Sequence, residues 1–107
     1  MGRLNYDGVV SVEIDDRALA HLQIVIASKL RRGEPFHFTW TENGSTGGGR
    51  TSIWVTPSIS LTFMFYGSRE ASINRHWLDV LMSTANSGAG LQLVAEPKVA
   101  LSEAVEY

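Results

Sequence analysis

Apolar and polar residues alternate through much of the stretch between Pro35 and Gly67, which carries most of the aromatic residues of the chain. A period of two residues is typical of a strand with one buried face, and aromatic and β-branched side chains suit a pleated surface. The connection at residues 42–49 contains four glycines and predicts a mobile hairpin tip. We therefore predict a meander of three consecutive antiparallel strands. They are expected at residues 36–41, 51–56 and 61–66.

The N-terminal residues carry the signal of a β-hairpin. Asp7 and Gly8 form a dipeptide that favours a tight two-residue turn, so we predict a hairpin over residues 3–14. Its first strand is short enough to be an edge strand. The second strand places three β-branched residues on one face, namely Val10, Val12 and Ile14.

A change to helical periodicity follows this hairpin. Asp15 or Asp16 can cap the exposed N–H groups of a helix, and their charge favours its positive end. Gly33 can adopt the left-handed conformation that ends a helix, and Pro35 prevents its continuation. The predicted apolar stripe consists of Leu19, Leu22, Val25, Ile26 and Leu30.

A second amphipathic helix is expected after the meander, with Ser68 or Ser72 as its cap. The glycine- and polar-rich residues 86–90 end it, and a last short strand is expected at residues 91–95. Its predicted stripe consists of Ile73, Trp77, Val80, Leu81 and Thr84, with Leu78 beside it.

The predicted order of elements is β-β-α-β-β-β-α-β, which indicates an α+β fold with a mainly antiparallel sheet and both helices packed on one face. The other face would mix polar residues with Trp54, Met64 and Tyr66. A mixed surface of this kind suggests self-association. We therefore predict a homodimer with these three residues in its interface.

Length and composition predict a single domain over residues 1–97, followed by a tail, residues 98–107, that is either frayed or docked on a partner. The absence of cysteine excludes disulfides and thiolate chemistry and fits a reducing compartment. No apolar run is long enough to span a membrane, and the N-terminus lacks the apolar core of a signal peptide. We expect a cytoplasmic protein without a membrane partner. The net charge of −2 provides no global basic field for nucleic acid.

Several segments together resemble a family of actinobacterial proteins of about this length and of unknown function, whose members are often automatically labelled "ATP-dependent DNA ligase". The resemblance extends over the chain up to about Pro97, and it implies no catalytic residues. Its motifs are Leu4-x-Tyr6, Asp15-Asp16-Arg17-x-Leu19-Ala20-His21-Leu22-Gln23, Lys29-Leu30-Arg31-Arg32-Gly33-Glu34, Phe36-x-Phe38-x-Trp40, Gly47-Gly48-Gly49-Arg50, Phe65-Tyr66-Gly67-Ser68, Ile73-Asn74-Arg75-x-Trp77 and Glu96-Pro97.

The residues do not support ligase activity in this chain. Nucleotidyltransferase ligases use a Lys-x-Asp-Gly motif whose lysine bonds covalently to AMP. The Asp-Gly pair here is Asp7-Gly8, and the lysine position holds Asn5, whose amide is not a nucleophile. The chain is also too short for a nucleotide-binding domain plus an OB-fold.

Basic residues raise a second functional hypothesis. Residues 44–51 fit a phosphate-loop pattern with arginine in place of lysine, but a strand rather than the required helix is expected after them. A looser anion-binding role for the glycine amides and Arg50 stays open. With Arg31 and Arg32, Arg50 would form a patch for DNA or nucleotide if the fold joined them. A basic helix C-terminus, stabilised by the helix dipole, also accounts for Arg31 and Arg32.

The three histidines, His21, His37 and His76, have no metal-ligand spacing, and we predict no metal site and no cofactor. His37 alternates with Phe36 and Phe38 and is expected to face away from them. His76 and Asp79 lie three apart on the second helix, which suits either an acid/base pair or a surface hydrogen bond.

The favoured hypothesis is a non-enzymatic module that acts through protein–protein contacts or self-association. The alternative is a DNA- or nucleotide-binding accessory factor linked to DNA repair or ligation. A small enzyme that uses His76 and Asp79 is the third interpretation.

Overall fold

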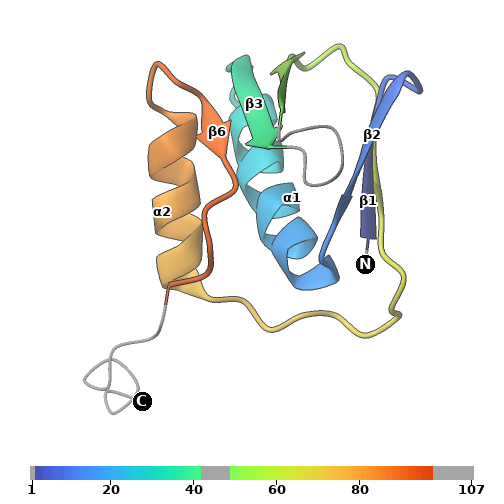
Figure 1. Ribbon diagram of the computed structural model, residues 1–107. Helices are drawn as coiled ribbons and strands as arrows, with labels where there is room; N and C mark the ends of the chain where they lie inside the picture. Colours follow the sequence, from blue (N-terminus) through green and yellow to red (C-terminus); the bar gives the residue numbers. More distant parts are fainter. Residues whose placement is uncertain (1, 42–48, 98–107) are drawn as a thin grey trace.

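The computed structural model describes residues 2–41 and 49–97 and confirms the α+β class (Figure 1). Within these residues, two helices and six strands follow one another in the expected order. They are β1 (Gly2–Tyr6), β2 (Val10–Ile14), α1 (Asp16–Arg31), β3 (Phe36–Thr41), β4 (Arg50–Val55), β5 (Leu61–Met64), α2 (Arg75–Ala85) and β6 (Leu91–Gln92).

The strands form two three-stranded sheets, of order β2-β1-β5 and β4-β3-β6, which we call the first and second sheet. The predicted hairpin of β3 and β4 is present, but the prediction of a three-stranded meander is wrong because β5 pairs with β1. β1 is therefore a central strand and not an edge strand. Alternation shows which face of a strand is buried, not which strand lies beside it. Here Phe63 pairs with Leu4, so β5 completes the apolar inner face of the first sheet.

The N-terminal hairpin turns at Asp7 and Gly8, as predicted, but three residues rather than two separate the paired positions Tyr6 and Val10. Asp7 and Gly8 have φ angles of 55° and 70°, and positive values at both central residues characterise the type I′ turn. The inward face of β2 carries Val10, Val12 and Ile14, as expected, with Ile14 fully in the core. The turn thus places the apolar face of this hairpin toward α1.

Both ends of α1 follow the local sequence signals. The Asp15 carboxylate accepts a hydrogen bond from the Ala18 N–H, and Gly33 has a φ of 70° just beyond the helix. The predicted stripe is buried except at Leu30, which is half-buried. Lys29 is buried as well, because its Nζ donates to Asn86 Oδ1 at 2.7 Å and pairs with Glu34 at 3.1 Å.

The start of α2 differs from the prediction. Its cap is Asn74, whose side chain accepts from the Trp77 N–H, and neither Ser68 nor Ser72 lies in the helix. Ile73 precedes the helix and is exposed, so it does not belong to the stripe. The fully buried members of α2 are Trp77, Leu81 and Ala85. The last strand is shorter than expected, and β6 runs parallel to β3.

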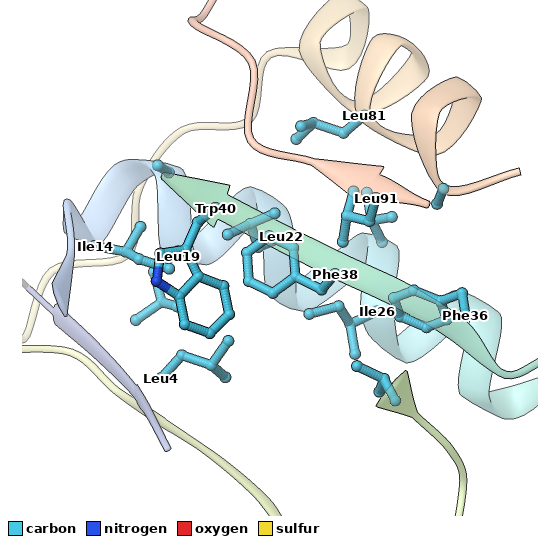
Figure 2. Close-up of a cluster of buried hydrophobic side chains, with 14 of the residues drawn as sticks. Leu4, Ile14, Leu19, Leu22, Ile26, Phe36, Phe38, Trp40, Leu81 and Leu91 are labelled. Carbon is cyan, nitrogen blue, oxygen red and sulfur yellow. The ribbon is translucent and has the colours of Figure 1, made fainter. Parts of the chain in front are cut away.

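The buried apolar side chains of both helices and of the inner sheet faces form one core cluster (Figure 2). In Figure 2, Phe36, Phe38 and Trp40 of β3 point toward α1, and Leu91 lies between β3 and Leu81 of α2. His37 faces outward from the same strand, as predicted.

Within residues 2–41 and 49–97, no helix is both long and apolar enough to cross a bilayer. The predicted tail at residues 98–107 lies outside the described residues.

Candidate functional site

A groove of about 490 Å³ lies between α1 and the connection from β5 to α2. This connection, residues 65–73, crosses below the first turns of α1 from the first sheet to the start of α2 (Figure 1). We call this hollow the α1 groove. Its large apolar side chains are exposed, and charged residues line it as well. The large apolar residues are Ile24 of α1, Phe65 and Ile73, and the charged residues are Asp16, Arg69 and Glu70.

Asp16 holds one wall of the groove. Its two carboxylate oxygens accept hydrogen bonds from the Tyr66 N–H at 3.3 Å and the Gly67 N–H at 2.8 Å. The Gly67 bond, and to a smaller degree that of Tyr66, lowers the pKa of the Asp16 carboxyl. A Cβ atom on Gly67 would lie 3.3 Å from Asp16 Oδ2, so the close approach favours glycine. The chain leaving β5 is thereby attached to the first turn of α1.

The far end of the connection is held by charged groups that we call the Arg17–Glu96 cluster. The Arg17 guanidinium donates to both Glu96 oxygens, at 2.8 and 2.7 Å, and to the Ser72 carbonyl at 2.7 Å. Asn74 Nδ2 also donates to Glu96, at 2.9 Å. Arg17 first, and then Asn74, lower the pKa of Glu96 to about 2, and Glu96 raises the pKa of Arg17. This cluster joins the start of α1, the start of α2 and the segment after β6.

His21 lies fully buried beneath this cluster. Its Nε2 accepts the Asn74 N–H at 2.9 Å, and its Nδ1 lies 2.8 Å from the Arg17 carbonyl. Because an amide N–H only donates and a carbonyl only accepts, the proton resides on Nδ1. The ring also packs 4.5 Å from that of Trp77. Both nitrogens are engaged, so His21 has a structural role and is not available as a metal ligand or as a base.

Residues 1–96 match the model of a family described as a domain of unknown function, DUF7882. The chain belongs to the DUF7882 family. Comparison with curated proteins and with solved structures gives no match. The matched part of the DUF7882 chain ends at Glu96, the residue that Arg17 binds, so it includes both walls of the α1 groove and the cluster at its end.

The DUF7882 fold does not bring the three predicted anion-binding arginines together. Arg31 and Arg32 are exposed at the C-terminal end of α1. Arg50 pairs with Thr41 at the far end of β3. Five residue steps separate Phe36 from Thr41, or roughly 16 Å along the strand. Of residues 44–51, proposed above as an anion loop, residues 44–48 lie outside the described residues.

The three predicted interface residues are exposed but lie on different sheets of the DUF7882 domain. Trp54 is on the outer face of the second sheet, with its ring 4.7 Å from that of His37. Met64 ends β5 in the first sheet, and Tyr66 follows it beside the α1 groove. The structure therefore places Met64 near Tyr66 and leaves Trp54 apart from them.

The catalytic alternative gains no support from geometry. His76 and Asp79 are both exposed on α2 and make no contact with each other among the described residues. Within the same residues, no group of three or more histidines and carboxylates lies close enough to hold a metal ion.

Sequence reasoning missed the α1 groove and the Arg17–Glu96 cluster of the DUF7882 domain. One signal was present: Arg17 lies in the first turn of α1, where the helix dipole disfavours a cation. An arginine at that position indicates an acidic partner elsewhere in the fold. The identity of that partner, Glu96, depends on how residues 65–97 run across the molecule.

Proposed function

We propose that this protein is a non-enzymatic module that acts through protein–protein contacts and self-associates as a dimer. The observation that supports the proposal is a run of three consecutive exposed large side chains, Met64, Phe65 and Tyr66, with exposed fractions of 45%, 37% and 57%. Large exposed apolar side chains that gather in one short segment are a feature of interaction sites.

The backbone beneath this run is held in place, which supports an interface more than a loosely packed segment. Asp16 binds the amides of Tyr66 and Gly67, and Met64 pairs with Arg3 of β1 in the first sheet. Side chains on a fixed backbone lose less conformational entropy on binding than those on a mobile loop. A second copy of the chain presents the same run, so two copies can meet across a twofold axis through identical surfaces.

The test is the mass of the protein in solution across a dilution series in the micromolar range, for the wild type and two matched variants. We expect a dimer that dissociates on dilution. Tyr66→Ser should weaken dimerisation at least tenfold, which corresponds to about 1.4 kcal/mol. Trp54→Ser removes a similarly exposed aromatic ring from the second sheet and should leave the dimer unchanged.

A wild-type monomer at every concentration contradicts the proposal. If Trp54→Ser weakens the dimer and Tyr66→Ser does not, the interface instead lies on the outer face of the second sheet. The variants thus separate the existence of the dimer from the position of its interface.

The competing hypothesis, a DNA- or nucleotide-binding accessory factor, requires Arg31, Arg32 and Arg50 to act on one ligand. Their placement at opposite ends of β3 argues against a single compact patch. It predicts a shift of labelled DNA at low salt that weakens steeply as salt is raised and disappears when Arg31 and Arg32 are both changed to Ala.

A further inference from the structure

The α1 groove is continuous with the exposed run of residues 64–66 that supports the proposed dimer. Phe65 belongs to both features, because it is exposed within the run and also lines the groove. Its neighbour Tyr66 is the most exposed residue of the run and is not part of the groove lining. One surface of the molecule therefore carries an exposed aromatic side chain directly beside a hollow.

This arrangement is complementary to itself under a twofold rotation. In a twofold dimer both copies use the same patch, so every contact between two different residues occurs twice, once in each direction. A patch made only of exposed side chains has no hollow to receive those of its copy. When the axis passes between Tyr66 and the groove, each copy offers one side chain and one hollow to the other.

The size and the lining of the groove suit a tyrosine side chain. Its volume of about 490 Å³ lies within the range of roughly 300–1,000 Å³ that is usual for binding pockets. Ile24 and Ile73 offer apolar surface to an aromatic ring. The exposed Gln23 of α1 also lines the groove, and its amide both donates and accepts hydrogen bonds, as a buried phenolic hydroxyl requires.

The charges in the groove are compatible with a second copy of the same surface. Arg69 and Glu70 are adjacent residues of opposite sign, and neither forms an ion pair within the part of the chain that the structure describes. A twofold axis that passes near both brings Arg69 of one copy toward Glu70 of the other. Exposed pairs of this kind contribute little affinity, but they fix the register of two surfaces.

We propose that, in the dimer, the Tyr66 side chain of each copy inserts into the α1 groove of the other copy. This inference rests on the dimer proposed above and specifies what each exposed run contacts there. The hydrogen bonds from the Tyr66 and Gly67 amides to Asp16 fix the inserted side chain relative to the groove wall. Tyrosine is also enriched among the residues that dominate binding at interface centres.

The test fills the groove and leaves the run of residues 64–66 unchanged. Ile24→Glu places a charged side chain in the groove, and glutamate is a good helix former. Leu93→Glu is the matched control, because Ile24 and Leu93 have exposed fractions of 39% and 36% and Leu93 does not line the groove. Mass in solution across a dilution series should show dimerisation weakened at least tenfold by Ile24→Glu and unchanged by Leu93→Glu.

The double variant, Tyr66→Ser with Ile24→Glu, distinguishes a direct contact from two separate contributions. Substitutions of residues in contact are not additive, whereas those of independent residues are. If Tyr66 lies in the groove, the double variant should dimerise within about threefold of the weaker single variant. A loss equal to the product of the two single losses, a hundredfold or more, overturns the inference.

The failure of this inference is distinct from the failure of the proposed function. Dimerisation of Ile24→Glu at wild-type strength, or an equal loss in Leu93→Glu, overturns the insertion into the groove and leaves the dimer itself in place. A wild-type chain that is monomeric at every concentration refutes the dimer and the inference together.

Discussion

Replacing His21 with leucine tests the buried contact between the two helices. Leucine fills a similar volume, so the change removes the hydrogen bonds and the ring contact without a large cavity. The Arg17 carbonyl keeps its helical partner, the His21 backbone N–H, but the Asn74 N–H loses its acceptor. An unsatisfied buried donor costs about 1–3 kcal/mol, and the lost packing against Trp77 adds about 0.5–1.5 kcal/mol. We expect the free energy of unfolding to fall by roughly 2–4 kcal/mol.

Urea unfolding of His21→Leu, followed by circular dichroism, measures this change, and His37→Leu is the matched control. His37 also packs against a tryptophan, at 4.7 Å, but on an exposed sheet face, with a 3.3 Å contact to the Ser52 hydroxyl. Its replacement should alter the free energy of unfolding by less than about 0.5 kcal/mol. For His21→Leu, the urea concentration at the unfolding midpoint should fall, while the slope of the unfolding free energy against urea concentration stays unchanged. Equal effects of the two substitutions would refute the structural role assigned to His21.

Three further predictions concern the ends of elements and the charged cluster. The pKa of Glu96 is lowered from 4.5 to about 2 in the folded state. The stability that the ionised carboxylate contributes is therefore complete above pH 4.5 and is lost as the pH falls toward 2. Glu96→Gln should flatten the pH dependence of the unfolding midpoint between these two pH values. Asn74→Ala removes the cap of α2 together with the hydrogen bond to Glu96, and the loss of the cap alone should cost about 0.5–2 kcal/mol in the same unfolding assay. Asn74→Asp keeps a capping oxygen but places a carboxylate beside that of Glu96, so Asn74→Ser, which keeps a neutral capping oxygen, should be the more stable of these two variants. Gly90→Ala should destabilise more than Gly33→Ala, measured by thermal unfolding, because both have positive φ but a Cβ at Gly90 would lie 2.6 Å from the His37 carbonyl oxygen, whereas the space at Gly33 is open.

Features set by neighbours in sequence were predictable. The turn at Asp7 and Gly8 and the limits of α1 depend on backbone conformation and capping within a few residues. The outward orientation of His37 follows from alternation alone. For each of these, the physical cause lies within one turn or one strand.

Features set by distant contacts were not predictable from the same signals. Ser68, Ser72 and Asn74 are all capable of capping a helix. In the structure, contacts from α1 hold the segment in which Asn74 is the cap: Arg17 binds the Ser72 carbonyl, and His21 accepts the Asn74 N–H. The partner of β5 and the α1 groove were missed for the same reason.

The positions of the candidate site residues show the same division. That Arg31 and Arg32 lie at a helix end was foreseen, but the distance to Arg50 depends on the direction and register of β3. The separation of Trp54 from Met64 depends on the division of the strands between two sheets. A single alternating stretch contains no signal for that division.

The pairing of β1 with β5 has a consequence for synthesis on the ribosome. Arg3 pairs with Met64, so one edge of β1 has no partner strand until more than half of the chain has been made. Until then the nascent hairpin of β1 and β2 presents an unpaired strand edge, the feature through which incomplete chains aggregate. Products truncated before β5 should therefore aggregate more readily than the full chain.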